Sequence, residues 1–276
     1  PLYSSAASDV YKRQIQCLRV TGPTWITLLA AAFTGGAFIF PTFHWYPPAI
    51  VCGGAAIACV IYWLWTATSQ IPEKDKDVRD AGLSLKLPVY ASGPDSVGWW
   101  GVWITMLGDA TAFASLVFGF VFYWTAKPDF PPAGTEHALA GYLVLGVAAL
   151  MASWASIYGA RVTNRQGRVT TARALLVAAP LLAILGSGLF YLSVAASGLE
   201  PTSHVYPAIV WAVMIWTIVH TGGGVIMQGY CLAGALFGKI TPDHDADLWN
   251  VALYWHFVCL TVVVAGLTIG LMPRVM

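Results

Sequence analysis

Long apolar stretches separated by short polar segments dominate the chain. Each stretch is about 20 residues or longer, the length that a helix needs to cross about 30 Å of hydrocarbon. The stretches do not alternate over about 10 residues, as strands of a membrane barrel do. The pattern predicts an all-α membrane protein of about seven transmembrane helices. The expected spans are residues 22–41, 48–67, 99–124, 138–160, 173–197, 206–236 and 249–271.

The longest polar stretch divides these helices into two and five. Residues 69–97 mix acidic with basic side chains, which is typical of a linker. We therefore expect a two-helix segment at residues 15–68, a cytoplasmic linker at 69–97 and a five-helix domain at 98–276. No internal repeat is visible in the sequence, whereas many transporters are built from paired repeats.

The first residues are expected to be foreign to the protein. They read PLYSSAASDVYKRQ, and Asp9–Gln14 are what the codons GAT GTG TAT AAG AGA CAG encode. That string resembles a transposon-end adapter used to build sequencing libraries. Residues 1–14 are therefore interpreted as a non-native, adapter-derived segment. We expect the natural polypeptide to begin upstream, with this chain as its C-terminal part.

Composition supports a membrane protein and offers few sites for soluble chemistry. Hydrophobic residues make up 58% of the chain and charged residues 10%, whereas soluble domains average about a quarter charged. The net charge of +1 indicates no nucleic-acid partner. The five cysteines form no C-x-x-C pair, which predicts small buried side chains rather than disulfides or metal ligands. They are Cys17, Cys52, Cys59, Cys231 and Cys259.

Basic residues favour one side of the predicted membrane. Seven spans put the termini on opposite sides, and one of these sides offers only Lys127 and Arg274. The positive-inside rule therefore predicts a cytoplasmic N-terminus and an external C-terminus. The basic residues expected on the cytoplasmic side are Arg19, Lys74, Lys76, Arg79, Lys86, Arg161, Arg165, Arg168, Arg173 and Lys239.

Aromatic residues frame the third span. Trp99, Trp100 and Trp103 stand at its start, and Tyr123 and Trp124 at its end. Tryptophan and tyrosine are enriched at both membrane–water interfaces. We interpret the three tryptophans as interface anchors.

Three ionisable residues are expected at mid-membrane, where such side chains are costly and are functional candidates by default. Asp109 lies about 15 Å and His256 about 12 Å inside their helices, at 1.5 Å per residue, and His220 is near the middle of the sixth span. Helices in register would let the three meet on one interior face as a buried, proton-linked network. The alternative is a structural Asp–His hydrogen bond that holds helices together.

The same histidines leave a second function open. His220 and His256 lie on separate helices and are candidate axial ligands of a b-type haem. The nearby Gly222, Gly223 and Gly224 fit either a haem pocket or close helix packing. These histidines leave open a membrane b-haem electron-transfer protein. A small transporter is the other alternative, which the missing internal repeat disfavours.

The other polar motifs indicate local structural roles. His44, His137, His204 and His244 fall in predicted loops or at helix ends. In the segment TPDHDADLWN, Asp245 or Asp247 is expected to cap the last helix, since the spacing of a calcium loop is missing. No phosphate-binding loop, nucleophile elbow, zinc spacing or paired carboxylates occur in the sequence, so we expect no catalytic residue and no metal ligand in this chain.

Three segments carry a family resemblance. HDADLWNVALYWHFV, residues 244–258, resembles the last-helix signature of cytochrome c oxidase subunit III. SVGWWGVWITMLGDATAFASLVFGFVFYW is similar to the third helix of that family, with Asp109 where an acidic residue, usually Glu, lies in the membrane. HVYPAIVWAVMIWTIVHTGGGVIM resembles its penultimate helix, with His220 at a family histidine. Gly223 replaces a second histidine, and Cys259 stands where the family often has Asp.

The resemblance covers residues 84–276 and implies the C-terminal part of a fused subunit I/III polypeptide of a bacterial haem-copper oxidase in the inner membrane. It implies a subunit without a redox centre, packed against subunit I, which is expected to be fused upstream, and subunit II. The haem and copper would belong to those partners, and this chain alone would not be catalytic. It also implies phospholipids in a cleft between the two-helix and five-helix parts, and a role in proton uptake.

Overall fold

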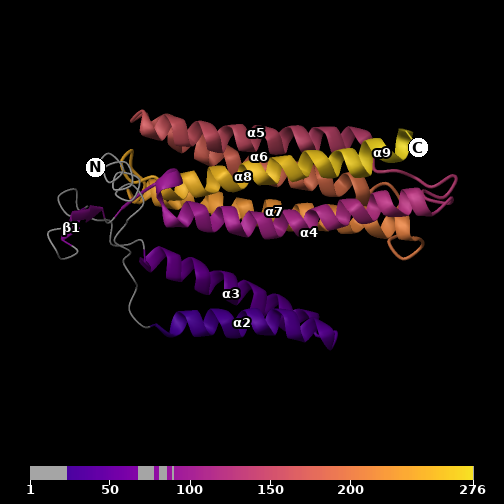
Figure 1. Ribbon diagram of the computed structural model, residues 1–276, viewed down its shortest axis with the longest axis horizontal. Helices are drawn as coiled ribbons and strands as arrows, with labels where there is room; N and C mark the ends of the chain where they lie inside the picture. Colours follow the sequence, from indigo (N-terminus) through magenta and orange to yellow (C-terminus); the bar gives the residue numbers. More distant parts are fainter. Residues whose placement is uncertain (1–23, 68–77, 81–85, 89, 276) are drawn as a thin grey trace, which may run out of the picture. The chain divides into compact units, whose positions relative to one another are not determined.

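The computed structural model describes residues 24–67, 78–80, 86–88 and 90–275 (Figure 1). Among these residues, seven helices are long and apolar enough to cross a membrane. The prediction of an all-α, multi-pass membrane protein is confirmed. The expected adapter-derived segment at residues 1–14 lies outside the described residues.

The chain folds as two compact units, residues 1–91 and 92–276. The first unit contains two of the membrane-spanning helices and the second contains five. The boundary falls within the polar stretch at residues 69–97.

The first unit is a helical hairpin of α2 (Trp25–Thr42) and α3 (Tyr46–Ala67). The Thr24 side chain accepts a hydrogen bond from the Ile26 N–H and so caps α2, as a threonine at this position commonly does. Among its described residues only two alanines are buried, Ala49 and Ala56. Most of its apolar surface is therefore exposed in this chain and needs lipid or protein to cover it.

A short β-hairpin follows within the same unit. Strand β1 (Val78–Asp80) pairs antiparallel with β2 (Lys86–Pro88). The sequence pattern predicts no strand here, because three-residue strands are shorter than the runs of 4–8 residues that reveal strands.

The second unit is a bundle of five long helices that run side by side (Figure 1). It begins with a 3₁₀ turn, and its last span continues through a π-helical turn to a final short helix. The elements are η2 (Gly93–Asp95), α4 (Val97–Ala126), α5 (Ala140–Arg165), α6 (Val169–Ala195), α7 (Val205–Leu236), α8 (Ala246–Gly266), η3 (Leu267–Leu271) and α9 (Met272–Val275).

Neighbouring helices in the bundle are not always neighbours in sequence. Helix α4 packs against α7 and α8, and α5 packs against α6 and α8. The α5–α6 approach is closest at Gly146 and Gly186, where an added Cβ on Gly186 would lie 2.9 Å from the Gly146 carbonyl oxygen. Small residues allow this approach, which is a common device for joining helices in membranes.

The bundle core is apolar, with one buried polar chain across three helices. Trp255 and Tyr206 are among its largest fully buried side chains. Gln228 Nε2 on α7 donates to Ser153 Oγ on α5 at 3.0 Å, and that hydroxyl donates to the Ala179 carbonyl of α6 at 2.7 Å. The buried cysteines Cys231 and Cys259 are free thiols, as are the partly buried Cys52 and Cys59, while Cys17 lies outside the described residues.

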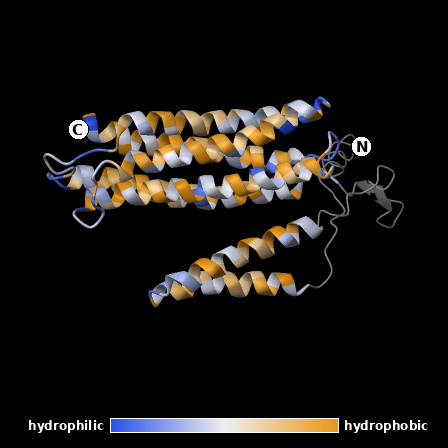
Figure 2. Cartoon of the chain, turned by 180° about the vertical axis from the view of Figure 1, so that it is seen from behind, coloured by the Kyte–Doolittle hydropathy of each residue, from blue (hydrophilic) through white to orange (hydrophobic). Residues whose placement is uncertain are grey.

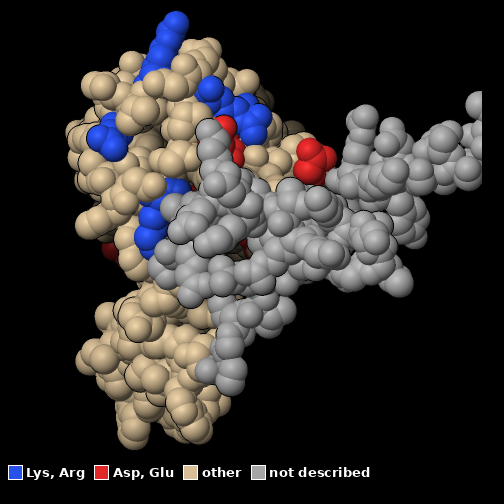
Figure 3. All heavy atoms as spheres, turned by 90° about the vertical axis from the view of Figure 1, so that its left-hand side faces the viewer, with Lys and Arg blue, Asp and Glu red and all other residues tan. Residues whose placement is uncertain are grey.

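Apart from Asp109 in the middle of α4, the acidic and basic residues of the five-helix unit lie at its two ends, and apolar residues dominate the middle of the helices (Figure 2). Helices α4, α6 and α8 begin, and α5 and α7 end, at one end. Basic residues gather there (Figure 3), and we call it the basic end. They are Arg161, Arg165, Arg168, Arg173 and Lys239.

The opposite end of the unit has Lys127 after α4 and Arg274 in α9. Within the five-helix unit, the basic side chains are therefore distributed between the two ends as the sequence pattern predicts. Which end faces the cytoplasm stays a prediction.

Candidate polar site between helices α4 and α7

Asp109 and His220 lie together in the bundle. The Asp109 Oδ2 atom on α4 is 3.7 Å from the His220 Nε2 atom on α7. Asp109 is the thirteenth of the 30 residues of α4, and His220 is the sixteenth of the 32 residues of α7. Both therefore lie near the middle of their helices, at the depth where an ionisable side chain is costly.

The backbone of α7 determines where the proton of His220 sits. The ring atom Nδ1 is 2.8 Å from the Trp216 carbonyl oxygen, which can only accept a hydrogen bond. Nδ1 therefore carries a proton, and the neutral ring presents the lone pair of Nε2 to Asp109. The Asp109 Oδ2 atom lies 3.7 Å from Nε2, beyond the distance of a direct hydrogen bond, so the two side chains form an ion pair only when the imidazole is protonated.

Aromatic side chains hold the histidine ring in place. The His220 ring stacks on Trp216, with 3.6 Å between ring centroids. Trp216 in turn contacts Phe113 of α4 at 4.6 Å. This packing joins α4 to α7 one turn from Asp109 and limits rotation of the imidazole.

Tyr254 on α8 is a third member of the site that sequence reasoning missed. Its hydroxyl donates to the His220 carbonyl oxygen at 3.0 Å, and its phenol interacts electrostatically with Asp109. An added Cβ on Gly223 would lie 3.6 Å from this hydroxyl. The only sequence feature that could have indicated Tyr254 is its position two residues before His256, which places the two side chains on different faces of the helix.

His256 does not share the surroundings of Asp109 and His220. Its Nδ1 donates to the Ala252 carbonyl one turn earlier, and its ring meets the edges of Trp154 and Tyr158 on α5. The expectation that it is buried is wrong, because His256 is exposed on the surface of the chain. The reason is its position on α8, because the buried Val258 lies about 200° further round the helix and so points the opposite way.

Asp109 is also less buried than expected. Its side chain is 38% exposed in this chain, whereas that of His220 is 16% exposed. In a membrane this exposed part of the carboxyl group needs a polar partner or water, because hydrocarbon supplies no hydrogen bonds. The site is thus open on the α4 side.

The two histidines proposed as haem ligands have different neighbours. His220 faces Asp109 and stacks on Trp216, whereas His256 contacts Trp154 and Tyr158. Among the described residues, no group of three or more His, Cys, Asp or Glu side chains is arranged to hold a metal ion.

The three predicted anchor tryptophans cluster at the start of α4. Trp99 packs edge-on against Trp100 and Trp103, with ring centroids 5.0 and 5.9 Å apart. The Trp100 indole N–H donates to the Pro94 carbonyl at 3.0 Å. Their position at the basic end is that of an interfacial aromatic belt.

Asp245 occupies the capping position expected for it but does not make the expected capping hydrogen bond. Asp245 is the residue that precedes α8, but its side chain makes no capping hydrogen bond. Its carboxylate instead pairs with Arg165 of α5, with Nε and Oδ2 2.7 Å apart. A guanidinium nearby is a stronger partner for a buried carboxylate than backbone N–H groups are.

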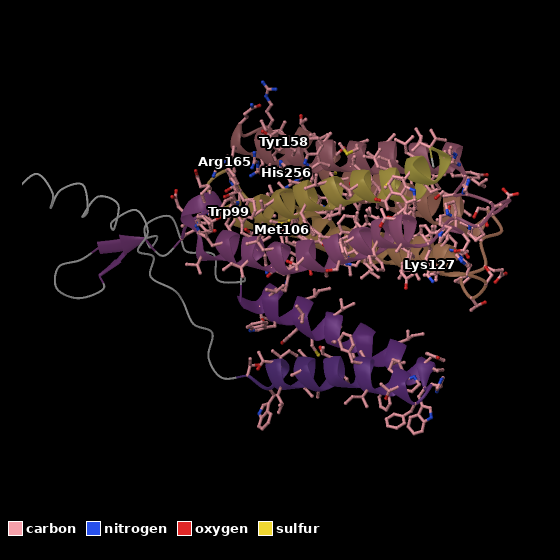
Figure 4. All side chains as sticks on the ribbon, turned by 45° about the vertical axis from the view of Figure 1, so that its right-hand side comes forward. Trp99, Met106, Lys127, Tyr158, Arg165 and His256 are labelled. Atoms are coloured by element: carbon pink, nitrogen blue, oxygen red, sulfur yellow. The ribbon has the colours of Figure 1, made fainter. Side chains whose placement is uncertain are left out.

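Figure 4 shows Trp99, Tyr158, Arg165 and His256 toward the basic end and Lys127 at the other end of the five-helix unit. The fold and these contacts define a multi-pass helical membrane protein with an acid–histidine pair inside its bundle. No family model and no curated protein matches the chain in sequence comparisons.

Proposed function

We propose that the chain is the subunit III-like part of a haem-copper cytochrome c oxidase of an aerobic respiratory chain, in a bacterial inner membrane with its N-terminal side cytoplasmic. In this proposal it supports assembly, binds phospholipid and assists proton uptake by the catalytic subunit. Its partners are subunit I and subunit II, which hold the haem and copper.

The Asp109–His220 pair is the observation that supports this proposal best. The resemblance links Asp109 to the intramembrane acid of a third helix and His220 to a histidine of a penultimate helix. These residues are 111 positions apart in sequence, yet their side chains lie 3.7 Å apart. A carboxyl group and an imidazole placed together within a membrane are suited to passing or buffering protons. The partly exposed carboxyl would face the catalytic subunit or water leading to it.

Co-purification tests membership of the oxidase. The chain carries an affinity tag at its C-terminus and is extracted from its native membranes in mild detergent. The expected result is a complex that contains haem and copper and consumes oxygen when supplied with reduced cytochrome c. Purification of the chain without any haem-copper subunit would overturn the proposal.

The role of Asp109 is tested within that complex. Asp109→Asn removes the ionisable carboxyl group while keeping the size of the side chain, so we expect oxygen reduction to begin normally and to decay within fewer turnovers. Asp95→Asn, an exposed acid in the 3₁₀ turn, is the matched control and is expected to behave as wild type. Unchanged assembly, lipid content and turnover durability in Asp109→Asn would contradict the proposal.

The same preparation separates the alternatives. A reduced-minus-oxidised spectrum of the chain freed from its partners is expected to show no haem band, whereas a b-type band would favour the electron-transfer protein. Uptake of a labelled solute into vesicles that contain only this chain would favour a transporter.

A further inference from the structure

Gln228 on α7 and Trp255 on α8 each bury a polar atom that has no partner among the described residues. The Gln228 Oε1 atom accepts no hydrogen bond, and the Trp255 Nε1 atom donates none. Among the described residues, these are the two side chains that hold such an atom and are themselves fully buried in the bundle core. Because hydrocarbon supplies no hydrogen bonds, each atom lowers the stability of the bundle if it stays unpaired.

Neighbouring hydrogen bonds fix the role of each atom. Ser153 Oγ gives its single proton to the Ala179 carbonyl oxygen, at 2.7 Å, so it can only accept from Gln228. It accepts from Gln228 Nε2, at 3.0 Å. The Gln228 amide therefore turns its oxygen away from Ser153. That oxygen can only accept a hydrogen bond, whereas the indole N–H of Trp255 can only donate one.

The two atoms lie over the same turn of α7. An added Cβ on Gly224 would lie 3.1 Å from Trp255 Nε1, so the indole N–H lies against the backbone of α7 at Gly224. Gln228 follows Gly224 by one turn on the same face of α7, and a helical side chain covers the turn before its own Cα. The Gln228 amide therefore extends toward Gly224, where the indole N–H lies. An acceptor and a donor thus face the same part of the core.

The preceding turn of α7 shows a different arrangement. Ser187 Oγ on α6 donates to Thr221 Oγ1 at 2.9 Å, and the Thr221 hydroxyl donates to the Ile218 carbonyl at 3.0 Å. Protein atoms alone satisfy this buried pair. At Gln228 and Trp255, by contrast, the missing partner has to donate one hydrogen bond and accept another.

We propose that one water molecule binds between Gln228 Oε1 and Trp255 Nε1 and joins α7 to α8 inside the membrane. It donates to the amide oxygen and accepts from the indole N–H, as buried waters commonly do for polar groups that lack a protein partner. An ion does not fit, because Ser153, Gln228 and Trp255 are uncharged and an isolated charge is costly at this depth. The inference goes beyond the proposed function and does not depend on membership of an oxidase.

The water completes a polar link across four helices. The Gln228–Ser153–Ala179 hydrogen bonds already connect α7 with α5 and α6, and the water adds α8 through Trp255. In an apolar core such a link favours one rotation of each helix over the others, because any other rotation leaves these groups unpaired.

Solid-state NMR of the full chain alone tests the site. The chain is labelled with ¹⁵N at the tryptophan indoles and reconstituted into phosphatidylcholine vesicles, and magnetisation is transferred from water to nearby N–H groups. Trp255→Phe, which lacks the N–H, identifies the Trp255 signal. The wild-type Trp255 indole is expected to receive magnetisation from water and yet to exchange slowly with deuterium after transfer to D₂O.

Either of two wild-type results would overturn the proposal. If water transfers no magnetisation to Trp255, the indole is bonded directly to Gln228 or is unpaired. If the indole N–H exchanges rapidly with deuterium, bulk solvent reaches it and no water is held in the core. These measurements decide the question even where a variant fails to fold.

Removal of the acceptor tests the part played by Gln228. Gln228→Leu lacks the amide oxygen and is expected to abolish the transfer from water to Trp255. Gln166→Leu makes the same change at the exposed residue after α5, and this matched control is expected to keep the transfer of wild type. Circular dichroism and gel filtration check that both variants fold. Transfer that persists in Gln228→Leu would show that the water does not bridge these residues.

A double-mutant cycle tests whether the two groups share a partner. Gln228→Leu and Trp255→Phe each remove one of the two bonds to the water, whereas the double variant removes both polar groups. The fall in the thermal unfolding midpoint of the double variant is expected to be smaller than the sum of the two single falls. Additive falls would mean that the two groups are independent, and would overturn the proposal.

Discussion

Arg165 on α5 and Asp245 before α8 form an ion pair in which the carboxylate is almost fully buried. Nε and Oδ2 lie 2.7 Å apart, and the two side chains are 47% and 1% exposed. The second guanidinium nitrogen, Nη2, also reaches Ser92 Oγ at 3.0 Å. The pair therefore fixes the end of α5 to the start of α8 and to the chain that enters α4.

Removal of Arg165 is expected to destabilise the five-helix unit. Arg165→Met leaves the buried Asp245 carboxylate without its charged partner, and we expect the free energy of unfolding to fall by about 1–3 kcal/mol. Equilibrium unfolding in mixed micelles, followed by tryptophan fluorescence, measures this change. Arg168→Met, at an exposed neighbour, is the control and should have little effect. Full stability of Arg165→Met would contradict the role assigned to the pair.

Helix contact at Gly186 yields a second prediction. A Cβ there would lie 2.7 Å from Leu150 Cγ and 2.9 Å from the Gly146 carbonyl oxygen, so α5 and α6 would have to separate. Gly186→Ala is expected to cost about 1–3 kcal/mol through overpacking. Gly188→Ala lies on the same helix with open space around it and should be neutral or slightly stabilising. Thermal unfolding of the two variants side by side distinguishes them, and equal midpoints would refute the close contact.

The proton position on His220 can be observed directly. The hydrogen bond to the Trp216 carbonyl requires a proton on Nδ1, so ¹⁵N NMR of labelled histidine should show Nδ1 protonated in wild type. Asp109→Asn is expected to keep the proton on Nδ1, since the Trp216 carbonyl oxygen that accepts it is unchanged. A neutral ring protonated only on Nε2 would show that the inferred arrangement is wrong.

Stability is expected to depend on pH through His137, which lies in the loop before α5. Burial lowers the pKa of His137 below its ordinary value of 6.5; Arg274 lowers it further and Glu136 partly raises it. The unfolded chain then binds the proton at a higher pH than the folded chain. The contribution of His137 to the free energy of unfolding is therefore full above pH 6.5. It is lost as the pH falls from 6.5 toward the lower pKa that His137 has in the folded chain.

This dependence is measured by unfolding between pH 7.5 and about pH 5, the range over which an ordinary histidine titrates. His137→Gln keeps a polar partner for the Tyr206 hydroxyl, which lies 3.0 Å from His137 Nδ1, but has no titrating group. Its stability is expected to change less over that range than the stability of wild type. An equal slope in both proteins would exclude His137 as the source.

Local pattern alone predicts most of the helices. The spans expected from apolar stretches agree with the observed helices to within a few residues at most ends, because a membrane helix satisfies its own backbone hydrogen bonds and needs only length and hydrophobicity. The mid-helix depths of Asp109 and His220 follow from the same reasoning, since depth depends only on distance along one helix. The division into two and five spans likewise follows from the polar stretch between them.

Tertiary structure alone decided which of these residues meet. Helix α4 packs on α7 and α8, which brings Asp109 to His220 and adds Tyr254, while the rotation of α8 turns His256 outward toward Trp154. Asp245 likewise pairs with Arg165 rather than capping α8, because the packing of α5 against α8 brings these two side chains together. An apolar helix in lipid is hydrophobic on all sides, so its sequence carries little information about which face turns inward. That choice depends on the close contacts between helices, such as Gly146 with Gly186, which only the folded bundle reveals.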